Sequence, residues 1–494
     1  MAELNDLLNL GRRTRKHDDR RHLTQMRKRV ALVRQQLHRL AQDSGVTTDG
    51  SQPVNHPVVH EGNGTLRRVR VRLDYGTDGL DVDLPDERVT VIEPVLRPAV
   101  PDATATLTAA LRAPIGCSPL RQRIRKGQRV AISVCDITRA QPRREQLAAL
   151  FEEMPDVPRS DITIFIATGT HRSNTDAELE RMLGRDILSS CRVINHNSRD
   201  TASLAFVGRT STGVPVLLNR EFLQADVRIT TGFVEPHFFA GFSGGPKMVA
   251  PGLAGLETVM TLHDAGRIGH PNATWGVTDG NPVHDDVREI ATMVGVHFAV
   301  DVTLNRDQQI TAAFAGDILQ QHRAACGYAK ETAMRAVEEP FDVVLTTNSG
   351  YPLDQNLYQA VKGMSAAAKI VKRGGAIVCA SECRDGLPSH GSYGAILASQ
   401  PTPEALLAMI NSPGYSTPDQ WQVQVQSQIQ LKAQVLVKTS GLSASEISAA
   451  HFTPIDDVAQ TVDSALKRAG AGATLCVLPQ GPQTIPYLRE SLRS

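Results

Sequence analysis

Residues 230–263 read TTGFVEPHFFAGFSGGPKMVAPGLAGLETVMTLH. The stretch begins at the end of an expected strand, passes through a loop rich in Gly and Pro, and enters a helix that ends near His263. The loop carries His237 and Lys247 among glycines, which let the backbone approach a ligand closely. This strand–loop–helix unit concentrates more potential chemistry than any other part of the chain.

Short apolar strands alternate with helices on both sides of this stretch. Strands are expected at residues 129–135, 161–167, 191–195, 214–218 and 227–231, and again at 297–304, 309–314, 341–347, 375–380, 434–438 and 474–478. Such runs, in a chain too long for one core, predict two α/β domains with mostly parallel sheets flanked by helices. We assign residues 65–285 to an N-terminal α/β domain and 286–494 to a C-terminal α/β domain, and leave open whether the last segment folds back on the first domain.

The composition excludes several classes of protein. The net charge is +1 and aromatic residues make up 4% of the chain, so no surface for nucleic acid is predicted. No apolar run is long enough to cross a membrane, and the N-terminus lacks the apolar core of a signal peptide, which predicts a cytoplasmic protein. The seven scattered cysteines fit reduced thiols, and a metal or redox role for Cys379 and Cys383 is the less favoured alternative.

Residues 1–64 differ from the rest of the chain. Arg and Lys outnumber acidic residues at the start, apolar residues recur with a rough helical spacing, and a polar linker follows. We predict a basic helical arm and linker, an N-terminal helical extension of the two-domain body. A solvated extension, a contact that builds a homo-oligomer and a contact with an anionic surface remain open for it.

Polar residues follow the expected strands at the point where each strand ends. Ligands of parallel α/β sheets collect at these carboxyl ends. The clusters are Asp136 to Arg139, Thr168 to Arg172, Asn195 to Asn197, Gly232 to His237 and, in the second domain, Asn348 to Gln355 followed by Gln359 and Lys362. Because both domains contribute, we predict an active site in the interdomain cleft.

Two histidines, His171 and His237, directly follow strands in this set. A pair of imidazoles suits a reaction that needs a base on one side and an acid on the other. The alternative for each is a histidine that only satisfies local hydrogen bonds. Gln359 and Lys362 share one face of a helix at i, i+3 spacing and, together with Arg139, suit a ligand that bears a carboxylate.

Lys247 closes the glycine-rich loop, which favours a phosphate contact or a covalent attachment point over a plain surface amine. His263 is either a partner of the helix dipole or a metal ligand. The separations of His171, His237 and His263 do not match the short ligand spacings of a zinc site. The chain also lacks HExxH, CxxC, GxSxG and, after its first apolar strand, GxGxxG.

These residues lie in motifs that resemble those of the nickel-pincer-nucleotide lactate racemases and their relatives, the 2-hydroxyacid racemases and epimerases. The matching motifs are DITR (136–139), ATGTHR (167–172), GFVEPHFFAGFSGGPK (232–247), His263 downstream, and YPLDQNLYQAVKGM (351–364). The resemblance covers most of residues 66–485. The basic arm departs from the family pattern, which bears on oligomeric state and partner contacts.

The resemblance implies a role for each residue. Lys247 would hold a pyridinium-3-thioamide-5-thiocarboxylate mononucleotide covalently, and His263 would ligate its nickel beside sulfur and carbon donors, a set that suits Ni(II). Further cofactor contacts would come from Asp136, Arg139, Gly244 and Gly245. The acid/base pair would be His171 and His237, and the substrate would be bound by Arg139, Gln359 and Lys362.

The implied activity is racemisation or epimerisation of a 2-hydroxy acid, lactate or a larger relative. One histidine would remove the hydroxyl proton while hydride moves from the α-carbon to the pyridinium, and the other would supply the proton when hydride returns to the opposite face. Proteins that synthesise the cofactor are implied partners. Two other hypotheses remain: a pyridoxal-phosphate-type racemase that uses Lys247, and a carboxylate- or sugar-acid-binding protein without turnover.

Overall fold

The computed structural model describes residues 67–388 and 391–489, and the helical arm and linker predicted for residues 1–64 lie outside them. Within the described residues the chain forms two six-stranded sheets with apolar cores on both faces. The predicted fold class, mostly parallel sheets flanked by helices, is confirmed. No helix in this part of the chain is both long and apolar enough to cross a membrane.

The first sheet has the strand order β13-β12-β9-β4-β5-β6. Its strands are β4 (Val130–Cys135), β5 (Ile162–Ala167), β6 (Arg192–Asn195), β9 (Val227–Phe233), β12 (Phe298–Leu304) and β13 (Ile310–Gly316). Neighbours pair in parallel except β13, which runs antiparallel to β12. The chain adds β5 and β6 on one side of β4 and then returns with β9 on the other side, so the sheet has a switch point between β4 and β9.

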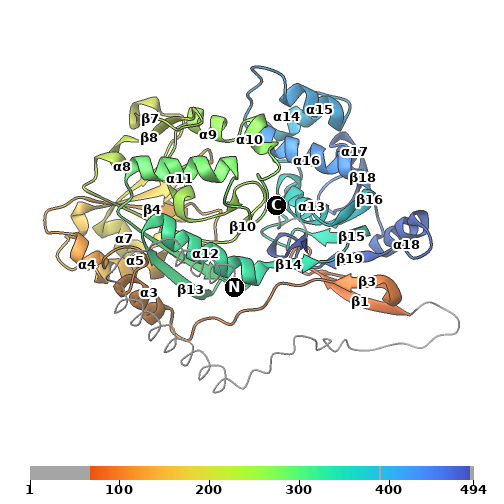
Figure 1. Ribbon diagram of the computed structural model, residues 1–494, viewed down its shortest axis with the longest axis horizontal. Helices are drawn as coiled ribbons and strands as arrows, with labels where there is room; N and C mark the ends of the chain where they lie inside the picture. The colour runs from red at the N-terminus through yellow and green to blue at the C-terminus, as the bar shows by residue number, and fades with distance from the viewer. Residues whose placement is uncertain (1–66, 389–390, 490–494) are drawn as a thin grey trace, which may run out of the picture. The chain divides into compact units, whose positions relative to one another are not determined.

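Successive residues of these strands enter two different cores, as the period of two requires. Ile132 lies in a core with α5 (Arg143–Glu152), and its neighbour Ala131 lies in a core with α11 (Pro282–Val294). In Figure 1, α5 and α11 accordingly lie on opposite sides of β4. The first core also takes residues from α3 (Ala103–Arg112), α4 (Leu120–Arg123), α6 (Asp176–Leu183) and α7 (Arg185–Ser190), and the second from α8 (Arg220–Gln224), α9 (Leu256–Leu262) and α12 (Ile318–Ala333).

The second sheet is parallel throughout, with the order β18-β17-β16-β15-β19-β3 and a switch point between β15 and β19. Its strands are β3 (Val89–Val91), β15 (Phe341–Thr347), β16 (Val371–Ala380), β17 (Gln434–Lys438), β18 (Thr453–Pro454) and β19 (Leu475–Leu478). One face is covered by α13 (Leu357–Ala368), α14 (Tyr393–Ala398), α15 (Pro403–Ile410), α16 (Gln420–Lys432) and α17 (Ala444–Ala449), and the other by α18 (Val458–Ala469).

Helix α13 lies unusually close to the end of β15. A Cβ atom at Gly363 would sit 1.9 Å from the carbonyl oxygen of Thr347, so only glycine permits this approach. The amide of Gly363 also donates a hydrogen bond of 3.0 Å to the side chain of Asn348, directly after β15. The close approach fixes where the preceding residue, Lys362, projects.

Several strands belong to a different sheet from the one implied by the predicted domain boundary at residue 285. Strands β12 and β13, assigned to the second domain, extend the first sheet, because α11 returns the chain to pair β12 with β9. Strand β3, assigned to the first domain, pairs with β19. The hairpin of β1 (Arg68–Leu73) and β2 (Leu80–Pro85) also packs against the second sheet, where its alternating apolar side chains are buried. Alternation shows that a strand has a buried face but not which sheet covers it.

Three smaller pairs complete the described strands. They are β7 (Leu204–Arg209) with β8 (Pro215–Asn219), β10 (Pro236–His237) with β11 (Gly241–Phe242), and β14 (Met334–Val337) with β20 (Ile485–Leu488). The last pair ties the C-terminal segment to the chain just before the second sheet. The β10–β11 pair shapes the loop that follows β9.

We expect Ile132→Ala to lower the free energy of unfolding by about 2–5 kcal/mol, because Ile132 is fully buried in a central strand and the truncation leaves a cavity. Urea unfolding followed by circular dichroism measures the change. Phe206→Ala is the control, since Phe206 is 62% exposed and its truncation should cost less than about 0.5 kcal/mol. Equal effects of the two substitutions would contradict the assignment of the core.

Candidate active site

The two switch points open onto one cavity of about 400 Å³. Ligands of α/β sheets bind at such points, outside the carboxyl ends of the strands. The lining includes residues that follow β4, β9 and β12 of the first sheet and β15 and β19 of the second, among them Arg139, Glu235, Asn305, Ser349, Lys362 and Gln480. Parts of three predicted clusters, after β4, β9 and β15, therefore line one cavity, whereas His171, His237, Lys247 and His263 are not among its lining residues.

Asp136 and His171 form a hydrogen-bonded pair at the ends of β4 and β5. Asp136 is almost fully buried, and its Oδ2 lies 2.7 Å from Nδ1 of His171, while Oδ1 accepts a 2.7 Å bond from the Thr138 hydroxyl. Burial opposes ionisation of Asp136, but the bond and the charge of His171, with Arg139 and Thr138, outweigh it and lower the pKa of the carboxyl. In the neutral form of His171, the carboxylate keeps the ring hydrogen on Nδ1, which leaves Nε2 as the atom that accepts a proton. The cofactor contact predicted for Asp136 stays a prediction; in the structure its carboxylate is bonded to His171.

The loop after β9 carries the remaining predicted groups around the ring of Phe239, which is itself buried. The ring centroids of His237 and His263 lie 4.5 and 5.1 Å from that of Phe239, both edge to face, and Nζ of Lys247 lies 5.7 Å from it. His237, His263 and Lys247 therefore all contact or approach the same aromatic ring.

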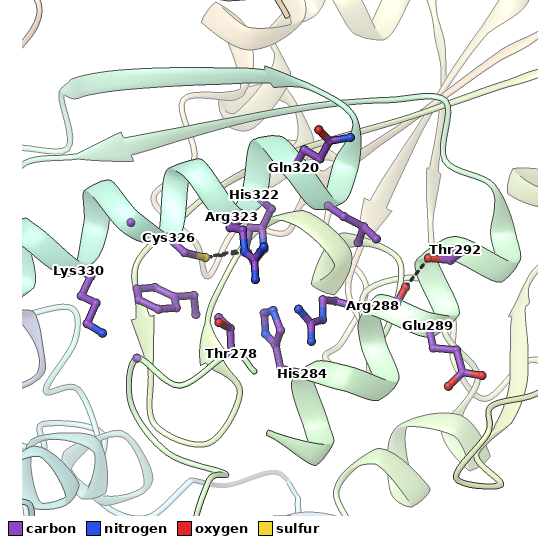
Figure 2. Close-up of a pocket in the computed structure, with 14 residues that line it drawn as sticks. Thr278, His284, Arg288, Glu289, Thr292, Gln320, His322, Arg323, Cys326 and Lys330 are labelled. Carbon is purple, nitrogen blue, oxygen red and sulfur yellow. Dashed lines mark hydrogen bonds between the residues drawn. The ribbon is translucent and has the colours of Figure 1, made fainter. Parts of the chain in front are cut away.

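On another side, the same loop borders a second cavity of about 500 Å³. Phe242 of the loop, His284 of α11 and His322 of α12 are among the residues that line it, and Figure 2 shows the two histidines facing this space. The predicted site residues are not among those that line this second cavity.

His237 is held as a neutral imidazole. Its Nδ1 accepts from the backbone amides of Phe239 and Ala240 at 3.5 and 3.3 Å, which leaves the hydrogen of the neutral ring on Nε2. Burial lowers the pKa of His237 well below its usual value, and repulsion from Lys247, Lys362 and Arg139 acts in the same direction. His237 and His171 therefore have opposite tautomers.

His263 follows the last residue of α9 and is oriented by that helix. Its Nδ1 donates a 2.7 Å bond to the carbonyl oxygen of Val259, so its Nε2 carries an available lone pair. Burial lowers the pKa of His263 to about 4, against the opposing effect of the Val259 bond. An imidazole that is neutral and oriented in this way meets the requirement for a metal ligand.

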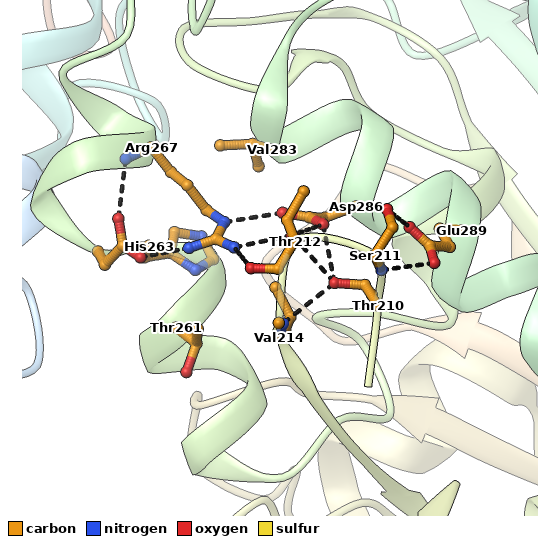
Figure 3. Close-up of polar contacts among 12 residues, drawn as sticks. Thr210, Ser211, Thr212, Val214, Thr261, His263, Arg267, Val283, Asp286 and Glu289 are labelled. Carbon is orange, nitrogen blue, oxygen red and sulfur yellow. Dashed lines mark hydrogen bonds and ion pairs between the residues drawn. The ribbon is translucent and has the colours of Figure 1, made fainter. Parts of the chain in front are cut away.

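A polar network fixes the turn that follows His263 (Figure 3). Arg267, in α10 (Ala265–Ile268), donates a 2.7 Å bond to buried Asp286 of α11 and a 2.9 Å bond to the Thr212 hydroxyl. It also pairs with Asp264, the residue next to His263. The network connects α10, α11 and the β7–β8 hairpin, and so limits the movement of His263.

Arg139 and Lys362 line the cavity, and both are close enough to Lys247 to repel its charge. Burial, followed by repulsion from Arg139 and Lys362, lowers the pKa of Lys247 to about 7, while Glu235 acts in the opposite direction. Burial and repulsion from Arg139 lower the pKa of Lys362 to about 8, again opposed by Glu235. Glu235 is exposed where it lines the cavity, but the surrounding protein removes part of its hydration. This loss raises the pKa of its carboxyl against the attraction of Arg139, Lys362 and Lys247. The site therefore combines an excess of cationic groups with weakly basic amines.

The other predicted residues lie nearby but differ in their surroundings. Gly244 precedes a short 3₁₀ helix that begins at Gly245 and contains Lys247. Gly245 has φ +47°, and a Cβ atom there would lie 2.4 Å from the ring of His322, so this glycine is required by the protein itself. Gln359 lies one turn before Lys362 on α13 and is not among the residues that line the 400 Å³ cavity.

Four residues near the site have no role predicted from the sequence: Phe239, Glu235, Tyr358 and Trp421. The ring centroid of Trp421 lies 4.8 Å from that of His263, and its Nε1 donates a 3.1 Å bond to the hydroxyl of Tyr358. Phe239, Glu235 and Tyr358 lie inside the quoted motifs, and Glu235 also belongs to the predicted cluster from Gly232 to His237. Trp421 lies on α16, and nothing in its local sequence points to His263.

The described residues contain no group of three His, Cys, Asp or Glu side chains arranged to hold a metal. The three-histidine zinc site is therefore not assembled, and a metal at His263 would need further donors from a bound group. Cys379 and Cys383 are fully buried, and burial raises the pKa of Cys383 to about 11, so both fit inert thiols.

We expect Lys247 of the apoprotein to be acylated with half-maximal rate near pH 7, whereas an ordinary lysine titrates near ~10.4. Arg139→Gln removes a repulsive charge and should raise this midpoint, and Glu235→Gln removes an attractive charge and should lower it. Competitive acetylation read by peptide mass spectrometry measures both shifts, with exposed Lys126 as the internal reference. A wild-type midpoint near that of ordinary lysine would contradict the electrostatic description of the cleft.

Comparison with known proteins identifies the family. The models of the lactate racemase N-terminal domain and C-terminal domain match residues 75–276 and 336–485. The lactate racemase of Thermoanaerobacterium thermosaccharolyticum is 32% identical over 84% of this chain and 98% of its own length, and that of Lactiplantibacillus plantarum is 35% identical over 76% and 89%.

Solved structures agree with this result. The lactate racemase apoprotein of T. thermosaccharolyticum superposes with a TM-score of 0.78 at 31% identity, over 85% of this chain and all of that one. A protein from Thermotoga maritima, at 19% identity and a TM-score of 0.59 over 80% of this chain and all of its own, shares the fold alone. The chain belongs to the lactate racemase family and is an isomerase of the racemase type.

Proposed function

We propose that this enzyme interconverts the stereoisomers of a 2-hydroxy carboxylic acid, lactate or a larger relative, with a nickel-pincer nucleotide held by Lys247 and His263. The observation that carries the proposal is the pair of histidines with opposite tautomers: Nε2 of His171 accepts a hydrogen, and Nε2 of His237 carries one. Arg139 acts electrostatically on both Asp136 and His237, so its charge lies near both histidine sites. A hydroxyl group beside Arg139 is then within the range of an acceptor and a donor.

His171 is the better prepared base. Asp136 is ionised and hydrogen-bonded to Nδ1, so the positive charge that forms when Nε2 takes the hydroxyl proton is stabilised directly. His171 is also the more exposed of the two, with 46% of its side chain accessible, which lets it exchange protons with water between turnovers.

His237 must take up a proton before it can act as an acid. In the free protein, burial and the charges of Lys247, Lys362 and Arg139 lower its pKa. A substrate carboxylate beside Arg139 and Lys362 offsets two of these charges, and acylation of Lys247 removes the third. Both changes raise the pKa of His237 against the effect of burial, which remains, and so increase the share of the protonated form that the reverse proton transfer needs.

The same cations supply substrate affinity. Arg139 and Lys362 line the cavity from opposite sheets and suit a carboxylate, and Gln359 one turn earlier on α13 can add an amide donor. The cavity volume of about 400 Å³ lies within the range of pockets that hold drug-sized ligands, so it has room for a side chain longer than that of lactate.

The residues present fit the proposed cofactor. Near neutral pH Lys247 is half in its amine form, which suits an acyl or thioacyl linkage, and Nε2 of His263 offers one nitrogen donor to nickel. When bound, the cofactor supplies a reversible hydride acceptor for the α-carbon of the substrate. Production of the active enzyme then depends on the proteins that synthesise this cofactor.

We expect His171→Ala and His237→Ala each to lower kcat for lactate racemisation by at least about 10²-fold, because each removes one of two proton-transfer groups. Chiral chromatography of D- and L-lactate, with enzyme produced beside the cofactor-synthesis proteins, measures the rate in both directions. His270→Ala is the matched control, since His270 is exposed and lies outside the site. Racemisation by His237→Ala at a tenth or more of the wild-type rate would remove His237 from the mechanism.

The identity of the cofactor has its own test. About one nickel ion per chain, lost in Lys247→Ala and His263→Ala, is expected for the purified enzyme. A nickel-free enzyme with the absorbance of a pyridoxal Schiff base would instead support the alternative use of Lys247. The substrate is identified by measuring kcat/KM for racemisation of lactate and of a panel of longer chiral 2-hydroxy acids. Binding of all these acids without turnover would support the non-catalytic alternative.

A further inference from the structure

Two buried histidines outside the cleft contact the loop that carries His237 and Lys247. His284, on α11, donates from Nδ1 to the carbonyl oxygen of Ala240 at 3.0 Å. His322, on α12, donates from Nε2 to the carbonyl oxygen of Ser243 at 2.8 Å. A carbonyl oxygen only accepts, so each bond requires a hydrogen on the named nitrogen. Both side chains are 2% exposed, and neither belongs to the set that the sequence predicts for catalysis.

The two imidazoles form a stacked unit. Their ring centroids are 5.6 Å apart and their planes differ by 16° (Figure 2). Burial lowers the pKa of His284 to about 3 and lowers that of His322 as well, so both rings stay neutral at ordinary pH. Each neutral ring then has one hydrogen, and each uses it on the loop.

The carboxylate of Asp301 holds the same loop at Gly245, two residues after Ser243. Asp301 of β12 is buried and accepts from the Gly245 amide at 3.1 and 3.2 Å and from Nε2 of Gln321 at 2.6 Å. Gly245 passes so close to His322 that a Cβ atom would overlap its ring. The backbone at Ala240, Ser243 and Gly245 is thus fixed at three points within six residues.

These attachment points lie between the reactive side chains. Ala240 follows His237 by three residues and also donates its amide to Nδ1 of that histidine. Gly245 precedes Lys247 by two residues and begins the 3₁₀ helix that contains it. A shift of the backbone at either point therefore moves a reactive group, and displacements of about 1 Å can cost 10²-fold in rate.

We propose that His284 and His322 are positioning residues of this enzyme, which act as neutral hydrogen-bond donors that fix the 240–245 loop and thereby set the places of His237 and Lys247. The inference rests on the proposed function for its effect on turnover, but its effect on the loop is independent of any cofactor. Buried histidines that only fill space would need no particular ring nitrogen.

The test replaces each ring with an amide that has its donor at the same place, or with an apolar residue. Gln matches the Nε2 donor of His322 and Asn matches the Nδ1 donor of His284, whereas Leu removes the donor. In the apoprotein, hydrogen exchange of the 240–248 segment is expected to be about tenfold faster in His322→Leu and His284→Leu. It should stay within about threefold of wild type in His322→Gln and His284→Asn. The pH midpoint of Lys247 acetylation should shift in the Leu variants only.

Turnover gives the second readout. In the loaded enzyme we expect His322→Leu to lower kcat at least about tenfold with KM within about threefold, and His322→Gln to restore most of kcat. Lys330→Gln is the control, because Lys330 lies on α12 and lines the same cavity but is not one of the groups bonded to the loop. It should leave exchange and kcat unchanged.

Each outcome decides the inference. Unchanged exchange and Lys247 labelling in folded Leu variants would overturn it, and so would equal losses in the Gln and Leu variants of His322, since ring packing would then be what matters. If His322→Leu fails to fold, the comparison of His284→Leu with His284→Asn applies the same criteria. Faster loop exchange in an enzyme that does not racemise any 2-hydroxy acid would support the positioning role and count only against the proposed function.

Discussion

The burial of three mutually repelling cations is the constraint on which the site depends. Arg139 follows β4, Lys247 lies in the loop after β9, and Lys362 projects from α13, so the charges come from separate elements and are brought together only by the fold. Among the described residues, Glu235 acts on both lysines in the opposite direction. Free side chains in water would move apart, and the packed switch points prevent this. Burial, with this repulsion added to it, lowers the pKa of Lys247 to about 7, so a large share of its side chain is a free amine near neutral pH.

The parts of this arrangement that depend on local sequence could be predicted. The apolar strand β4 and the polar Asp136 that ends it are adjacent in the chain, and the rule that ligands meet at carboxyl ends of parallel strands then brings Asp136, His171 and His237 into one region. The strand that leads into the glycine-rich loop, and the helix that ends just before His263, could be predicted because each is marked by the apolar pattern of its own residues. The roles of these residues stay predictions until the variants are measured.

The parts that depend on register and packing could not be predicted. β12 has the same apolar pattern whichever sheet it joins, and its place beside β9 is set by the crossover through α11. The β1–β2 hairpin alternates equally well against either sheet. Trp421 lies 158 residues after His263 in the chain, and the hydrogen bond that His171 donates to Asp136 joins residues 35 apart; neither contact can be read from the spacing in sequence.

The positive charge of the cleft also restricts which residue types can stand at positions 284 and 322, where they contact the 240–245 loop. An Arg or Lys donor at His284 or His322 would add a further positive charge near Lys247, and a carboxylate cannot donate to the carbonyl oxygens of Ala240 and Ser243. Neutral imidazole is a compact donor that avoids both problems. Lys247 itself lowers the pKa of both histidines, in addition to the larger effect of burial, so the charge of the cleft helps keep its supports neutral. Burial therefore has two effects here. It lowers the pKa of Lys247, which makes its amine reactive, and it keeps His284 and His322, which hold the loop of Lys247, in their neutral forms.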